Sequence, residues 1–103
     1  MATYGAITLT EVKQLLDEAG RDKIRLIDIR TPAEFDKQHI PVAENIPAEK
    51  LNDASFQQDE TLVCVCNHGK ERSQQAAALL GNKGYGKVYY LSGGTAGWFI
   101  EQQ

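Results

Sequence analysis

The chain has 103 residues, of which 42% are hydrophobic and 24% charged, and its formal net charge is -3. This length fits one small domain over residues 1–103, and the composition is too apolar for a disordered segment. The sequence shows no basic patch for nucleic acid, no apolar run that could span a membrane and no secretion signal. We therefore expect a soluble, cytoplasmic protein with neither a nucleic-acid nor a membrane partner.

The first elements predicted are a strand, a helix and a second strand. Residues 7–9 predict a short strand. Thr10 is expected to cap an amphipathic helix that ends at Gly20, because apolar residues recur at helical spacing between them. Residues 23–30 contain a run of apolar side chains that predicts the second strand.

A helix-start signal follows the second predicted strand. Thr31 and Glu34 have capping-box spacing, and Pro32 stands at the first helical position, where its missing N–H costs nothing. These residues predict a helix over 32–38. Two later prolines keep the chain extended, and a helical turn is expected at residues 48–51.

The second half of the chain repeats the strand-helix alternation. Residues 61–66 form an unbroken apolar run typical of a strand buried on both faces. Ser73 is expected to cap an alanine-rich helix that Gly81 stops. Residues 88–91 predict another strand, Ser92, Gly93 and Gly94 a turn, and residues 95–101 a last helix. This alternation predicts a small α/β domain whose mainly parallel sheet has helices on both faces.

A polar loop follows Cys66, which ends the predicted strand of residues 61–66. Parallel sheets bind ligands at the carboxyl ends of their strands, and loop N–H groups with the positive end of a helix dipole can stabilise a thiolate there. Gly69 permits the positive φ that the loop needs. Arg72 and Lys70 favour an anion, whereas Glu71 opposes one unless it turns outward. The candidate site is Cys66 with Asn67, His68, Gly69, Lys70, Glu71, Arg72 and Ser73.

Two other interpretations of the cysteines stay open. Buried cysteines are often inert apolar side chains, and we favour this for Cys64 because it lies inside the apolar run. The polar, cationic loop after Cys66 argues against the same interpretation there. Cys64, Cys66 and His68 also form a C-x-C-x-H pattern. Structural zinc usually takes four ligands at wider cysteine spacing, so we expect no metal and no other cofactor.

Several segments, in the same order, resemble the rhodanese (thiosulfate sulfurtransferase) family. They are LIDIRTPAEFDKQHIP at 26–41, NIP at 45–47, VCVC with the cysteine loop at 63–73, the AAALL helix, GYGKVYYLSGG at 84–94, and Trp98. These blocks cover nearly the whole chain, which makes the resemblance more specific than a lone cysteine motif. It implies a small rhodanese-like domain with Cys66 as the catalytic cysteine.

The resemblance also implies a reaction. Cys66 would take sulfane sulfur from a small donor such as thiosulfate, become a persulfide, and pass the outer sulfur to a thiol, cyanide or a protein acceptor. Asp28 and Arg30 match the family's D-x-R pattern. We expect Asp28 to brace nearby backbone and Arg30 to lie near the pocket rim. His39 matches the H-I-P pattern, where we expect a structural hydrogen bond.

The sequence departs from the family pattern at two places, and the second of them keeps other functions open. Val42 stands where the family often has glycine, so the backbone there must suit a β-branched residue. Five residues separate Cys66 from Arg72, where many rhodaneses have four. This longer loop resembles the related phosphatases and arsenate reductases, for which Glu71 could supply the acid. A cysteine-dependent phosphatase or arsenate reductase is therefore the second interpretation, and a non-catalytic binding module is the third.

Overall fold

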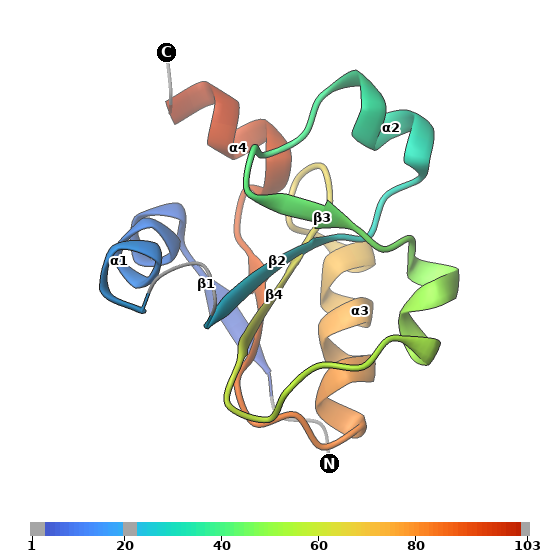
Figure 1. Ribbon diagram of the computed structural model, residues 1–103. Helices are drawn as coiled ribbons and strands as arrows, with labels where there is room; N and C mark the ends of the chain where they lie inside the picture. The colour runs from blue at the N-terminus through green and yellow to red at the C-terminus, as the bar shows by residue number, and fades with distance from the viewer. Residues whose placement is uncertain (1–3, 20–22, 102–103) are drawn as a thin grey trace.

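The computed structural model describes residues 4–19 and 23–101, which form a five-stranded parallel sheet between two layers of helix (Figure 1). The sheet has the order β1-β5-β4-β2-β3, with β1 (Gly5–Ile7), β2 (Ile24–Asp28), β3 (Ala43–Asn45), β4 (Thr61–Val65) and β5 (Val88–Leu91). The helices are α1 (Leu9–Ala19), α2 (Pro32–Lys37), the 3-10 helix η1 (Ala48–Asp53), α3 (Glu71–Asn82) and α4 (Gly94–Glu101). This architecture confirms the predicted fold class. No helix in the described ranges is long and apolar enough to cross a membrane.

Each face of the sheet has its own hydrophobic core, because successive side chains of a strand point to opposite faces. Figure 1 shows α3 and η1 on one side of the sheet and α1 and α4 on the other. The first core includes Ile27, Ile29, Leu62, Cys64 and Cys66 with residues of α3 and η1. The second includes Ile24, Leu26, Val63 and Val65 with residues of α1 and α4. The central strand β4 is thus buried on both faces, which explains its unbroken apolar run.

Helix α1 begins two residues earlier than predicted. Thr8, not Thr10, is its cap: the Thr8 Oγ1 accepts the Glu11 N–H at 3.1 Å, and Glu11 Oε1 accepts the Thr8 N–H at 2.9 Å. Thr10 has Lys13 three residues later, and an ammonium group cannot accept the return hydrogen bond of a capping box. The preceding strand is accordingly Gly5–Ile7 and not residues 7–9. The predicted stop at Gly20 lies outside the described residues.

The segment between β2 and β4 contains a confirmed helix and a strand that was not predicted. Thr31 and Glu34 form the expected reciprocal capping box around Pro32 in α2. Strand β3 pairs in parallel with β2 at the edge of the sheet. It has only three residues and none is fully buried, so its sequence carries no apolar run that would indicate a strand.

Helix α3 is longer at both ends than predicted. Its N-cap is Lys70, which makes no side-chain capping bond, and Ser73 lies buried inside the first turn. Gly81 is part of the helix, which continues to Asn82. The residue with the left-handed backbone typical of a helix end is Gly84, at φ 98°. Ser73 is therefore free of the capping role, and its hydroxyl is available to the loop.

Candidate active site

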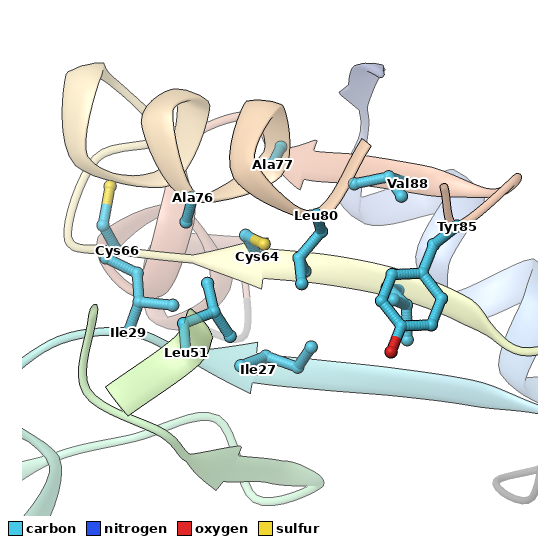
Figure 2. Close-up of a cluster of buried hydrophobic side chains, with 11 residues drawn as sticks. Ile27, Ile29, Leu51, Cys64, Cys66, Ala76, Ala77, Leu80, Tyr85 and Val88 are labelled. Atoms are coloured by element: carbon cyan, nitrogen blue, oxygen red, sulfur yellow. The ribbon is translucent and has the colours of Figure 1, made fainter. Parts of the chain in front are cut away.

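Cys66 follows the last residue of β4, at the carboxyl end of the sheet. Figure 2 shows its sulfur directed towards the first turn of α3, while the sulfur of Cys64 lies between β4 and the middle of the same helix. Cys66 is 3% exposed and Cys64 is fully buried. Burial raises the pKa of Cys64 to about 12, with a smaller contribution from Cys66. Cys64 is therefore not placed to react as a thiolate near neutral pH.

The sulfur of Cys66 lies within hydrogen-bonding groups of the loop. Its thiol donates to Ser73 Oγ over 3.2 Å, and that hydroxyl donates to the Lys70 carbonyl, also over 3.2 Å. Burial raises the pKa of Cys66, but hydrogen bonds from the Ser73 hydroxyl and from the backbone of Ser73, Lys70 and His68 outweigh it. The net result is a pKa below the ordinary value of a cysteine. These hydrogen bonds favour the thiolate form of Cys66 over the thiol.

Replacing the Ser73 hydroxyl is expected to make Cys66 less acidic. Alkylation by iodoacetamide requires the thiolate, so its rate rises with pH through the pKa of Cys66 and levels off above it. Ser73→Ala removes one hydrogen bond to the charged sulfur, which should move the midpoint of that profile up by about one pH unit. The variant is then slower near neutral pH and equal to the wild type at high pH. Ser55→Ala, an exposed serine in another loop, is the control; an unchanged midpoint in Ser73→Ala would contradict the assignment.

The N-terminus of α4 holds the loop from behind. The Thr95 N–H donates to the Cys66 carbonyl and the Ala96 N–H to the Asn67 carbonyl, both over 2.9 Å. Gly69 has φ +70°, and a Cβ there would lie 2.3 Å from the Leu91 carbonyl oxygen. A glycine is therefore required for the loop to pack against the end of β5. Because the Cys66 and Asn67 carbonyls accept hydrogen bonds from α4, the N–H groups of the loop remain available to the sulfur.

A shallow cavity of about 400 Å³ opens beside the sulfur. It is lined by Cys66, Asn67, His68, Lys70, Glu71 and Arg72. The side chains of His68, Lys70, Glu71 and Arg72 are exposed there. The structure thus brings the predicted loop residues around one opening, with Gly69 and Ser73 buried behind it.

Arg72 is engaged in an ion pair on the rim of this cavity. Its Nη2 donates to Glu34 Oε1 over 3.0 Å and its Nη1 to Glu34 Oε2 over 3.4 Å. Chiefly because of the Arg72 hydrogen bond, the pKa of Glu34 is lowered to about 2. A direct bidentate contact between Arg72 and a bound anion stays a prediction. Such a contact would compete with this carboxylate.

Asp28 and Arg30 form a buried ion pair behind the loop. The Arg30 Nε and Nη2 donate to the Asp28 carboxylate over 2.9 and 2.8 Å, and Asp28 also accepts the Arg30 backbone N–H. The remaining donors of Arg30 reach Asn67 Oδ1 at 3.0 Å and the Gln38 carbonyl at 2.6 Å. Asp28 braces the backbone as expected. Arg30 is 4% exposed and does not line the cavity; it supports the loop through Asn67.

Three further features of the sequence are His39, Val42 and the C-x-C-x-H pattern of possible metal ligands. The His39 Nδ1 donates to the Phe35 carbonyl over 2.7 Å, and the two rings stack at 3.7 Å, so His39 makes the expected structural hydrogen bond. Val42 has no positive φ, since among the described residues only glycines do. Within the described ranges, no three His, Cys, Asp or Glu side chains gather as metal ligands.

Two contributors to the site were not predicted. Glu34 was expected only as a capping residue, and the glycine turn before α4 only as a turn. Both reach the loop because of strand order: β4 lies between β2, whose end leads to Glu34, and β5, whose end leads to α4. The capping box and the glycine pair were visible in the sequence, but the neighbours of β4 were not.

Known proteins resemble this chain along most of its length. The profile of the rhodanese-like domain family matches residues 8–101. Thiosulfate sulfurtransferase GlpE of Pseudomonas syringae is 37% identical, over 85% of this chain and 81% of the relative. The probable adenylyltransferase/sulfurtransferase MoeZ of Mycobacterium tuberculosis is 38% identical over 99% of this chain, which spans only 26% of MoeZ.

A solved structure agrees with these sequence relatives. The human single-domain sulfurtransferase TSTD1 superposes with a TM-score of 0.82 at 28% identity, covering 95% of this chain and 97% of that chain. Its strong match extends over nearly all of both chains. From the matched profile, the relatives and the fold together, this chain belongs to the rhodanese-like domain family.

Proposed function

We propose that this protein is a sulfurtransferase that carries a sulfane sulfur on Cys66. The observation that supports this most directly is the Cys66 sulfur itself: although it is buried, hydrogen bonds from the loop to its ionised form lower its pKa. Relatives that match over most of their length, such as GlpE of Pseudomonas syringae, are named thiosulfate sulfurtransferases. The loop hydrogen-bond donors that favour a thiolate also favour a persulfide anion, because both species place negative charge on sulfur at the end of the strand.

The proposed reaction has two balanced steps. The Cys66 thiolate attacks the outer sulfur of thiosulfate; the sulfur–sulfur bond of the donor breaks, and sulfite leaves with the electron pair. A thiolate or cyanide acceptor then attacks the outer sulfur of the persulfide and regenerates the Cys66 thiolate. Neither step needs a cofactor or an external acid. The open cavity beside Cys66 admits a small donor or the thiol of a larger acceptor.

A phosphatase or arsenate reductase is the second candidate. The five-residue spacing between Cys66 and Arg72 favours it, and Glu71 lines the cavity where an acid would be needed. The pairing of both Arg72 terminal nitrogens with Glu34 opposes it, because a phosphate oxyanion would need that guanidinium. We therefore rank sulfur transfer first.

Intact-mass analysis distinguishes the two candidates. After incubation with thiosulfate and removal of the excess, the wild-type chain is expected to gain the mass of one sulfur atom, and peptide mapping should place it on Cys66. Cyanide should then remove the added mass and release thiocyanate. Hydrolysis of an aryl phosphate with no sulfur adduct would favour the phosphatase instead.

Cys64→Ala is the matched control for this experiment. Cys64 lies two residues away on the same strand, is fully buried, and has a raised pKa. The variant is expected to gain the same sulfur atom as the wild type. Loss of the adduct in Cys64→Ala with an intact fold would contradict Cys66 as the carrier. Absence of both the adduct and phosphatase activity in the wild type would support a binding module.

A further inference from the structure

One carboxylate, that of Glu34, connects helix α2 to the cysteine loop. Its Oε1 accepts the Thr31 N–H and hydroxyl, both over 3.1 Å, and the Arg72 Nη2 over 3.0 Å. Its Oε2 accepts the Asn67 Nδ2 over 3.3 Å and the Arg72 Nη1 over 3.4 Å. Glu34 therefore contacts two residues that line the cavity, although it is not in the loop and completes the cap of a different helix.

This contact changes the charge that an incoming donor meets. Around the cavity, Lys70 and Arg72 are positive, while Glu71 and the Glu34 carboxylate on Arg72 are negative. The positive and negative charges are equal in number, so the rim attracts an anion weakly. Glu34 stays ionised down to acid pH, since its pKa is about 2. The Glu34 carboxylate consequently opposes the charge of Arg72 throughout the pH range in which Cys66 reacts.

We propose that Glu34 is a positioning residue that sets donor specificity by holding Arg72 and opposing its charge. The inference rests on the proposed function, because it concerns the donor that loads sulfur onto Cys66. A doubly charged donor is repelled by Glu34 more than a singly charged donor of the same chemistry. Glu34 therefore reduces the preference of the site for dianions, and Arg72 would provide that preference if it were unpaired.

The test compares two sulfane donors that differ in charge. Thiosulfate is a dianion and methanethiosulfonate a monoanion, and each transfers one sulfur to a thiolate while releasing sulfite or methanesulfinate. The second-order rate constant for loading Cys66 is measured for both donors by timed intact-mass analysis. In Glu34→Gln, the ratio of the thiosulfate constant to the methanethiosulfonate constant is expected to rise about three- to tenfold, as the loss of one nearby, partly solvated charge predicts. Glutamine also serves in capping boxes, so α2 is retained.

Two control variants separate this role from a structural one. Thr31→Val removes the hydroxyl of the same cap but keeps the carboxylate on Arg72, so it should leave the donor ratio unchanged. Glu49→Gln removes one exposed negative charge from the neighbouring cavity that Arg72 also lines, but leaves the ion pair of Arg72 with Glu34 in place. It should change the ratio by less than about twofold, because solvent screens an exposed charge that is not held on Arg72.

The outcomes are distinguishable. If the wild type loads sulfur from neither donor, the proposed function is wrong and the inference falls with it. If the wild type loads sulfur from both donors and the ratio is unchanged in Glu34→Gln, only the role of Glu34 is overturned. The same holds if Thr31→Val raises the ratio as much as Glu34→Gln does, since the effect would then come from the helix cap.

Discussion

Cys66→Ser is expected to reduce sulfur transfer to the uncatalysed background, a loss of at least about 10³-fold. A serine hydroxyl does not ionise at neutral pH, and the loop hydrogen bonds that lower the pKa of a thiol cannot bring an alcohol into that range. Oxygen also forms no stable equivalent of the persulfide. The rate of thiocyanate formation from thiosulfate and cyanide measures the loss directly.

The same variant is expected to remain folded. Cys66 is 3% exposed, and a serine there can still hydrogen-bond to Ser73, so the free energy of unfolding should change by about 1 kcal/mol. A urea titration checks that the loss of activity is chemical and not structural. Turnover close to that of the wild type in Cys66→Ser would place the chemistry on Cys64 and contradict the proposed function.

Arg30→Met is expected to lower the free energy of unfolding by about 3–5 kcal/mol. The substitution keeps the apolar stem but removes a guanidinium that is buried against Asp28, whose side chain is fully buried. Asp28 would then hold a negative charge with no cationic partner and no access to water. The Asn67 and Gln38 oxygens would lose a donor at the same time. The midpoint of urea unfolding, at unchanged slope, measures the effect.

Arg25 offers the matched control for this prediction. It also pairs with carboxylates, those of Glu44 and Glu60, but its side chain is 32% exposed. Arg25→Met should cost only about 1–2 kcal/mol, because water screens the Glu44 carboxylate, which is 39% exposed, and the more buried Glu60 carboxylate keeps its hydrogen bond from the Gln57 N–H. The double variant Asp28→Asn/Arg30→Met removes the orphaned charge and should be more stable than Arg30→Met alone. Equal losses in Arg30→Met and Arg25→Met would show that burial is not the deciding factor.

The parts of this fold that could be predicted are those specified by neighbouring residues. The capping box of Thr31 and Glu34 and the apolar run of β4 each fall within a few positions, and the structure confirms both. The end of β4, the polar loop and the start of α3 are also contiguous. For that reason the sequence alone indicates Cys66 and its loop as the candidate site.

The parts that could not be predicted depend on contacts across the sheet. Glu34 and Arg72 are 38 residues apart, and their pairing follows from β2 lying beside β4. The hydrogen bond from Thr95 to the Cys66 carbonyl likewise requires β5 on the other side of β4. Ser73 shows the converse difficulty. Its local sequence pattern indicated a helix cap, whereas in the structure its hydroxyl accepts a hydrogen bond from the buried Cys66 thiol.

The anchoring of two loop carbonyls by α4 links the reactivity of the cysteine to the local stability of the last helix. Unwinding of the first turn of α4 would release the Cys66 and Asn67 carbonyls from the Thr95 and Ala96 amides. Oxygen dipoles could then rotate towards the sulfur and raise the energy of its anion. The acidity of the Cys66 thiol is thus coupled to fraying of α4, which follows it in the chain by a whole helix and a strand. The loop stabilises the sulfur anion only while the first turn of α4 stays folded.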